Sequence, residues 1–139
     1  MTALAADTGE LLRALARRPD GRPEYEAAIT TARLVIVHAL VLAEVDYFLR
    51  DERAAMRKLV AEIFDPKTTY DFELSLPSDL VRALQIDAKF GQLGLGLVDG
   101  TVAAVAERRR TYRVLTTDRK DFGALRIGAR WDRALQLVP

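Results

Sequence analysis

The sequence contains no cysteine and only one histidine, His38. The absence of cysteine excludes disulfides, thiolate zinc sites, iron–sulfur clusters and a cysteine nucleophile. A single histidine excludes a multi-histidine metal site, and His38 ends an apolar segment, so we expect it to be a satisfied core residue. Any bound metal must therefore have oxygen ligands, which favour hard ions such as Mg²⁺ or Mn²⁺.

Neither sign of charge dominates the chain. The 21 Lys and Arg residues nearly balance the 20 Asp and Glu residues, and the formal net charge is +1. The overall charge thus does not indicate a nucleic-acid-binding protein; only a local basic patch could. Long hydrophobic runs are also missing: the longest, at 34–45, is too short to span a bilayer. The start lacks the pattern of a secretory signal, so we expect a cytoplasmic protein without membrane association.

The length and the pattern of the sequence predict one α/β domain over residues 1–139. The continuous β-branched run at 34–37 is typical of a strand buried on both faces. Strands are predicted at 2–6, 34–37, 70–76, 112–116 and 134–138, and helices at 24–31, 39–50, 52–64, 77 to about 91–96, and 98–109, with another opening at Asp7. This alternation favours a three-layer α/β/α sandwich with a central parallel sheet.

Asp7 and Asp118 follow predicted strands, and Glu44 and Asp99 lie on predicted helices that could present them to the same crevice. In open parallel sheets, ligands bind beyond the carboxyl ends of the strands. Simpler interpretations exist for three of them, since Asp7 and Asp99 suit helix caps and Asp118 suits a turn. Glu44 is harder to explain in this way because its neighbours are apolar, and a lone ionised carboxylate is costly to bury.

If the four carboxylates converge, capping cannot be their whole role. Two carboxylates about 4 Å apart repel by about 4 kcal/mol at an effective dielectric near 20. A divalent cation reverses the sign of that interaction. It also activates bound water and polarises a phosphate. Without a histidine or thiol nearby, the chemistry that fits these residues is hydrolysis of a phosphodiester by metal-activated water.

The acidic residues lie within short motifs that resemble those of PIN-domain ribonucleases, especially the VapC-type toxins of bacterial toxin–antitoxin pairs. The motifs are Asp7-Thr8-Gly9, Val41-Leu42-Ala43-Glu44-Val45, Gly96-Leu97-Val98-Asp99-Gly100-Thr101, and Leu115-Thr116-Thr117-Asp118-Arg119-Lys120-Asp121-Phe122. Each motif alone is weak. Their order and spacing over nearly the whole chain make the resemblance fairly specific, above all the Thr-x-Asp-x-x-Asp-Phe ending.

The resemblance implies Mg²⁺- or Mn²⁺-dependent cleavage of RNA, homodimerisation, and neutralisation by a cognate antitoxin protein. The family's acidic residues correspond to Asp7, Glu44, Asp99 and Asp118, with Asp7, Asp99 and Asp118 as metal ligands and Asp121 as an additional acid.

Basic residues next to the acidic motifs are the candidates for substrate contacts. Arg119 and Lys120 adjoin Asp118 and could contact phosphate. The Thr8 hydroxyl could position water or cap a helix. The arginine run at 108–110 is equally consistent with a solvated helix end.

Two other classes of function remain to be weighed. One is a catalytically inactive PIN-like module that binds RNA or a protein. The other is a phosphoacceptor signalling domain, which needs adjacent acids after the first strand. Asp7 has no acidic neighbour in sequence, which disfavours the second class.

Overall fold

A parallel five-stranded sheet forms the centre of the molecule. The computed structural model describes residues 3–9, 23–116 and 118–139. The strand order is β3-β2-β1-β4-β7, and every neighbouring pair is parallel. The strands are β1 (Ala3–Ala6), β2 (Leu34–His38), β3 (Tyr70–Glu73), β4 (Arg113–Leu115) and β7 (Gln136–Val138). With β1 in the middle, β2 and β4 on either side bring their carboxyl ends beside the end of β1.

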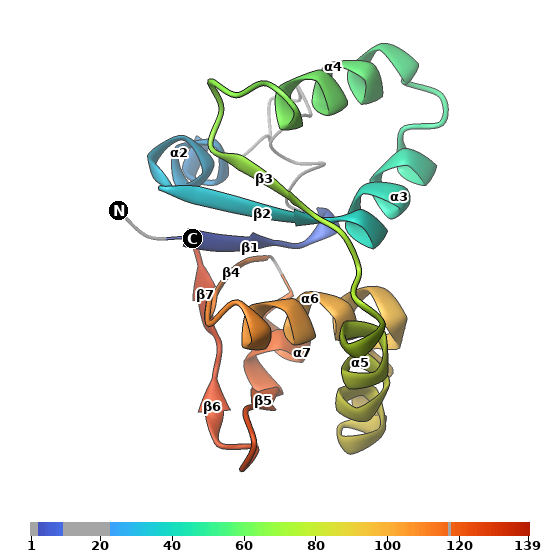
Figure 1. The fold of residues 1–139 in the computed structure, drawn as a ribbon, viewed down its shortest axis with the longest axis vertical. Helices are drawn as coiled ribbons and strands as arrows, with labels where there is room; N and C mark the ends of the chain where they lie inside the picture. Colours follow the sequence, from blue (N-terminus) through green and yellow to red (C-terminus); the bar gives the residue numbers. More distant parts are fainter. Residues whose placement is uncertain (1–2, 10–22, 117) are drawn as a thin grey trace.

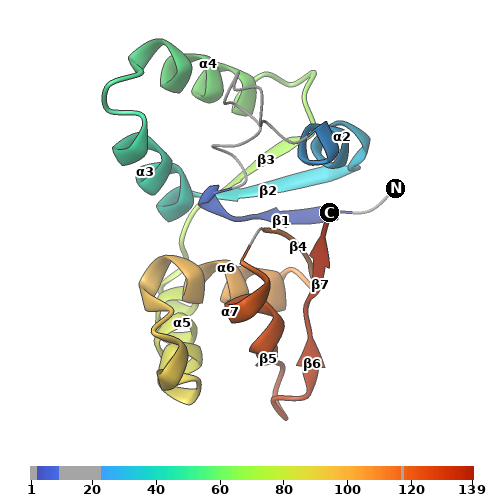
Figure 2. The same cartoon turned by 180° about the vertical axis from the view of Figure 1, so that it is seen from behind.

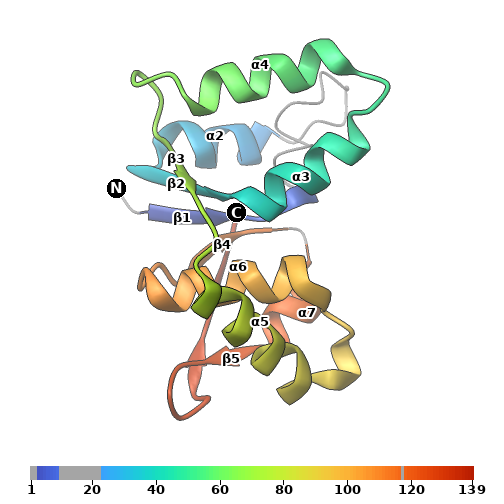
Figure 3. The same ribbon diagram turned by 45° about the vertical axis from the view of Figure 1, so that its right-hand side comes forward.

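Helices cover both faces of this sheet, which confirms the three-layer α/β/α architecture (Figures 1 and 2). One layer holds α2 (Pro23–Thr31), α3 (Ala39–Phe48) and α4 (Arg53–Ile63). The opposite layer holds α5 (Pro77–Lys89), the 3-10 turn η1 (Gly91–Leu93), α6 (Gly96–Arg108) and α7 (Arg119–Ala124). The two layers meet at one end of the sheet, where α3 and α6 contact each other (Figure 3).

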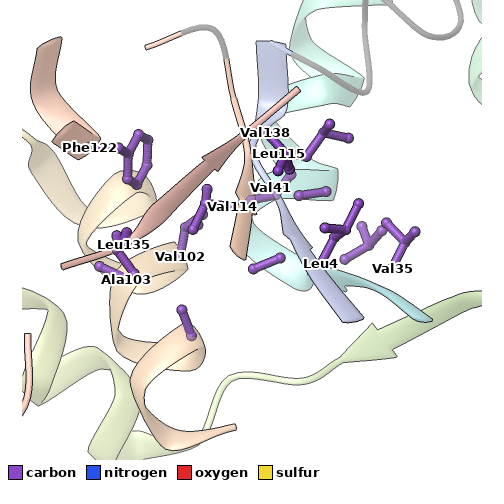
Figure 4. Packing of buried hydrophobic residues seen from close by; sticks show 14 of the residues in the cluster. Leu4, Val35, Val41, Val102, Ala103, Val114, Leu115, Phe122, Leu135 and Val138 are labelled. Carbon is purple, nitrogen blue, oxygen red and sulfur yellow. The ribbon is translucent and has the colours of Figure 1, made fainter. Parts of the chain in front are cut away.

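The hydrophobic core lies on both sides of the central strands. Val35, Val37 and Val114 are fully buried, as a strand covered on both faces requires. Figure 4 shows Val102, Ala103 and Phe122 on one side of β4 and Leu4, Val35 and Val41 on the other. Burial of this apolar surface, worth about 25 cal/mol per Å², fixes the sheet and therefore the positions of its strand ends.

The structure differs from the predicted elements mainly near the C-terminus. The strand predicted at 134–138 is interrupted at Leu135: β6 (Arg133–Ala134) pairs antiparallel with β5 (Arg126–Ile127), and only β7 joins the main sheet. Helix α7 was not predicted. The helix expected to begin at Val98 begins at Gly96, and the helix predicted to follow Asp7 falls mostly outside the described residues.

The side chains of Tyr47, Phe48 and Phe64 are 55–61% exposed, so they do not belong to the core of this chain. No helix in the described part of the chain combines the length and the apolar composition that crossing a bilayer requires.

Candidate active site

Asp7 follows the last residue of β1, at the centre of the sheet's carboxyl edge. Its backbone N–H donates to the carbonyl of Leu115 (3.1 Å), which continues the pairing between β1 and β4. One carboxylate oxygen accepts from the backbone N–H of Thr8 (2.7 Å). The other accepts from the hydroxyl of Thr116 (3.0 Å). Sheet pairing and these two bonds fix the position of a carboxylate that is only 9% exposed.

Thr116 connects the acid of β1 to the acid that follows β4. Its buried hydroxyl donates to Asp7 and accepts from the backbone N–H of Asp118 (2.9 Å). Asp118 in turn accepts from the backbone N–H of Asp121 (2.9 Å) and so caps α7. One oxygen of Asp118 is thus a helix cap, where the sequence had suggested a turn residue. We did not single out Thr116 from the sequence, although its place two residues before Asp118 in the Thr-x-Asp motif was a usable signal.

Asp99 lies in the first turn of α6 because that helix begins three residues earlier, at Gly96. The helix packs against α5 at Gly100, where an added Cβ would lie 2.8 Å from the carbonyl oxygen of Ala83. Glycine is therefore required at this close approach of the two helices. Residues 100–106 of α6 are all buried, and their packing holds Asp99 in place.

Glu44 comes from the other helical layer, on α3. Val41 and Val45 on either side of it are fully buried, so the helix is anchored to the core and Glu44 itself is half-buried. Asp46 belongs to a different face and pairs with Arg53 (2.7 Å), although Arg50 is only four residues away in sequence. Arg50 instead donates to the carbonyl of Tyr47 (2.9 Å).

The predicted acids affect one another electrostatically. We call Asp7, Glu44, Asp99, Asp118 and Asp121 the acidic group. Burial, followed by the negative charges of the other four members, raises the pKa of Asp99 to about 7. Burial also raises the pKa of Asp7, against the hydrogen bonds from Thr8 and Thr116, and the charges of Glu44 and Asp118 raise it further.

Asp121 belongs to the acidic group through its neighbour in α7. Burial, together with the charge of Asp118 and a hydrogen bond to it, raises the pKa of Asp121, while nearby Lys120 lowers it. Side chains that are distant in sequence thus share one region of strongly negative potential.

The donor chemistry of this region suits a hard divalent cation, because every acidic-group ligand is an oxygen. The Thr8 hydroxyl adds a further oxygen: it is buried and has no hydrogen-bond partner among the described residues. Within residues 3–9, 23–116 and 118–139, no three His, Cys, Asp or Glu side chains form a group that could hold a metal ion. Mutual repulsion opposes closer grouping of unneutralised carboxylates.

The three residues predicted to contact substrate have different surroundings. Thr8 is 3% exposed, beside Asp7. Lys120 is exposed and lies near Asp121. Arg119 is also exposed, and its guanidinium donates to the carbonyl oxygen of Pro139 at the end of β7.

The first two arginines of the 108–110 run are held by acids of other elements. Arg108 binds Asp79 through two nitrogens (2.8 and 3.0 Å) and also pairs with Glu73. Arg109 pairs with Glu73 (2.6 Å) and Asp71 (2.9 Å). We call these five residues the arginine–acid network. Arg108 and Arg109 therefore tie the end of α6 to β3 and α5, which neither interpretation of the arginine run had anticipated.

The fold of this chain is similar to that of PIN-domain proteins. Its five-stranded parallel sheet lies between helical layers, as in this fold, and the solved structures that resemble the chain include a VapC toxin and toxin–antitoxin complexes. The resemblance inferred from the motifs is thereby confirmed.

Particular relatives are similar over most of the chain. No protein-family model matches the sequence. The chain is 29% identical over 127 residues to ribonuclease VapC26 of Mycobacterium tuberculosis, with 86% of this chain and 90% of the relative covered.

Solved structures share the fold at low sequence identity. VapC20 of Mycobacterium tuberculosis, a toxin that cleaves the sarcin–ricin loop, matches with a TM-score of 0.72 at 14% identity, covering 87% of this chain and 94% of that one. A chain of a toxin–antitoxin complex from Klebsiella pneumoniae gives 0.68 at 19% identity and coverage of 87% and 91%. VapBC2 of Rickettsia felis, bound to a DNA fragment from its promoter, gives 0.68 at 16% identity and coverage of 99% and 100%.

Proposed function

We propose that this protein is a Mg²⁺- or Mn²⁺-dependent endoribonuclease and the toxin of a toxin–antitoxin pair. The observation that carries the proposal is the acidic group: burial and the charges of neighbouring carboxylates, which come from the ends of β1 and β4 and from α3 and α6, raise the pKa of Asp7 and Asp99. The similarity to ribonuclease VapC26 supports RNA as the substrate. The chain would act as one domain, in the cytoplasm.

Asp7, Asp99 and Asp118 are the residues that would hold the ion. When bound, a divalent cation supplies charge neutralisation of the scissile phosphate and acidification of a water ligand. Glu44 would accept a proton or a hydrogen bond from the attacking water, because it faces the same region from the opposite helical layer. The two hydrogen bonds on Asp7 keep its carboxylate oriented, since Thr8 and Thr116 fix both of its oxygens.

Binding of RNA next to the acidic group requires positive charge there. Lys120 is exposed beside Asp121 and is our candidate for a phosphate contact; Arg119 is the second. Replacing Lys120 with Ala should weaken RNA binding and reduce its salt dependence. Unchanged affinity and salt slope in this variant would remove Lys120 from the proposed site.

Cleavage of RNA by the purified protein is the direct test. Labelled RNA is incubated with Mg²⁺ or Mn²⁺, or with EDTA, and the products are separated by size. We expect internal cleavage only with the divalent ion and only with the carboxylates intact. Retained cleavage in both Asp7→Asn and Asp99→Asn would refute the assignment.

An inactive PIN-like binding module is the second candidate, because the acids are not grouped as metal ligands in the described residues. Calorimetric titration with Mn²⁺ separates the two functions. A nuclease site should give saturable heat that Asp99→Asn abolishes, whereas an inactive module should give none while still binding RNA or a protein.

Exposed apolar side chains support protein partners. Leu74, Leu76, Val81 and Leu84 are 43–67% exposed along the β3–α5 segment, a suitable surface for a second copy of this chain. Exposed Tyr47, Phe48 and Phe64 provide another apolar surface, for an antitoxin. Light scattering should report a dimer that Leu84→Asp disrupts. A monomeric wild-type protein would contradict the homodimer.

A further inference from the structure

His38 forms the junction between β2 and the helix that carries Glu44. It is the last residue of β2 and the N-cap of α3, and it is only 2% exposed. Its Nδ1 accepts a hydrogen bond from the backbone N–H of Leu40 (3.0 Å). Its Nε2 lies 2.9 Å from the hydroxyl of Ser75. The imidazole thus satisfies one of the free N–H groups at the start of α3, which a core histidine need not do.

These two contacts define the protonation state of the ring. A backbone N–H can only donate, so Nδ1 must be unprotonated, and the single proton of the neutral ring lies on Nε2, where it can be donated to Ser75. Protonation of Nδ1 would place two donors against each other. The cap therefore exists only while the imidazole is neutral, unlike the usual Ser, Thr or Asn caps, which do not titrate.

The capped turn leads directly to Glu44. Leu40 and Glu44 are four residues apart, so the carbonyl of Leu40 is the helical partner of the Glu44 backbone N–H. Val41 and Val45 anchor the body of α3 in the core, and the cap fixes its first turn. Loss of the cap frays that turn and loosens the hold on the Glu44 backbone while the rest of the helix stays packed.

We propose that His38 is a pH-dependent positioning residue: its neutral imidazole caps α3 and holds Glu44 toward Asp7 and Asp99, and protonation of the ring releases this hold. The proposal rests on the proposed nuclease function for its effect on cleavage. The cap itself, and its loss in acid, do not depend on that function.

The groups around His38 come from three elements. Glu73 on β3 and Asp79 on α5 favour the protonated ring, and Arg108 on α6 disfavours it. Burial is the largest influence, and it lowers the pKa of His38 below 6.5. Arg108 and both acids are already paired within the arginine–acid network. Because the pKa is lower in the folded chain, the stability that the neutral ring contributes is complete above pH 6.5 and is lost as pH falls through the folded value.

Two substitutions separate the two contacts of the ring. His38→Asn keeps an acceptor near the position of Nδ1 but cannot be protonated, so the cap should persist at every pH. His38→Gln keeps an amide near the position of Nε2, toward Ser75, but has no acceptor close to Leu40. The two side chains are both uncharged amides, and they differ in which contact they preserve.

Amide hydrogen exchange at Leu40, corrected for the intrinsic effect of pH, measures the cap directly. In the wild type we expect exchange to become about fivefold faster, the change that loss of an ordinary cap produces, as pH is lowered from 7.5 through the folded pKa of His38, which lies below 6.5. The Asn variant should show no such change, and the Gln variant should exchange rapidly throughout this pH range. An acid effect in the Asn variant equal to that in the wild type, or wild-type protection in the Gln variant, would overturn the proposal.

A measurement on the unmodified chain covers the case in which a variant fails to fold. The ¹⁵N shifts of the His38 ring should show an unprotonated Nδ1 and a protonated Nε2 at pH 7.5. A protonated Nδ1 at that pH contradicts the cap.

Cleavage rates then test the link to Glu44. The acid loss of activity should be several-fold smaller in His38→Asn than in the wild type, and equal losses would refute the positioning role. Exchange results as expected in a protein that cleaves no RNA would instead count against the proposed function while the cap stands.

Discussion

Two clusters of acids in this protein have the same residue types but opposite electrostatic surroundings. In the arginine–acid network, Arg108 and Arg109 neutralise Asp71, Glu73 and Asp79. Burial would raise the pKa of Asp79, yet the hydrogen bonds from Arg108 and from the Leu76 backbone hold it below its usual value.

The acidic group has no such arginine partners among its described hydrogen bonds. Burial and like charges raise the pKa of Asp99 to about 7, while Asp7 accepts from the Thr8 N–H and the Thr116 hydroxyl, and Asp118 accepts from the backbone N–H of Asp121. The difference shows which carboxylates contribute to the stability of the fold and which are maintained at a cost to stability. Carboxylates whose negative charge is uncompensated are the better candidates for a functional site.

The largest expected effect follows from removing charge within the acidic group. Asp99→Asn should reduce RNA cleavage at least about 100-fold, because the ion and the phosphate lose a charged ligand. The free energy of unfolding should stay the same or rise, since a repulsive charge is gone. Asp46→Asn, which changes an acid paired with Arg53 on the outer side of α3, is the matched control. Gel-based assays measure the cleavage rates, and thermal denaturation measures the stabilities. If Asp99→Asn cleaves RNA within tenfold of the wild-type rate, the acidic group is not the functional cluster.

In the arginine–acid network, removal of an acid should instead lower the stability of the fold. Asp79→Ala should lower the free energy of unfolding by about 2–3 kcal/mol, because Arg108 loses its bidentate partner and the N–H of Leu76 loses its acceptor. The exposed pair of Asp46 and Arg53 should contribute only about 0–1 kcal/mol in the parallel Asp46→Ala experiment. Urea denaturation of both variants provides the measurement. Equal losses would mean that the network is no more stabilising than a surface ion pair.

A divalent cation should stabilise only a protein with an intact acidic group. Mn²⁺ at ten times its dissociation constant should raise the free energy of unfolding by about 1.4 kcal/mol, and EDTA should reverse the gain. Asp99→Asn should lose this gain in stability. Asp79→Ala should keep the gain, although its free energy of unfolding is lower without the ion. Thermal shift with and without Mn²⁺ measures the effect, and an equal gain in Asp99→Asn would place the ion elsewhere.

A further expected effect is the pH dependence of stability without divalent ions. The pKa of Asp99 is raised from 3.8 to about 7 in the fold, so the folded chain binds more protons between these values. Stability contributed by this group is therefore present at low pH and is lost as pH rises toward about 7. The difference in free energy of unfolding between wild type and Asp99→Asn isolates the effect, because His38 is present in both. A difference that does not vary between pH 4 and 8 would contradict the raised pKa.

Much of the fold was predictable because its strands are fully buried. The apolar run ending at His38 can be accommodated only as a central strand, and the helix after it buries Val41 and Val45 against the sheet. The interruption at Leu135 was not predictable, because strands of two or three residues carry too little periodicity to separate. Helix α7 is equally short, and its cap at Asp118 was interpreted as an ordinary turn.

The sequence by itself determined the chemistry: no thiol, one histidine, and carboxylates that follow two of the strands or lie on two of the helices of a parallel α/β fold. Only the tertiary structure decided which charges meet. The local sequence around Arg108 and around Asp99 does not reveal that the arginine binds Asp79 while the aspartate faces Asp7 and Glu44. Such pairings join residues far apart in the chain, and they depend on strand order and helix packing rather than on the identity of sequence neighbours.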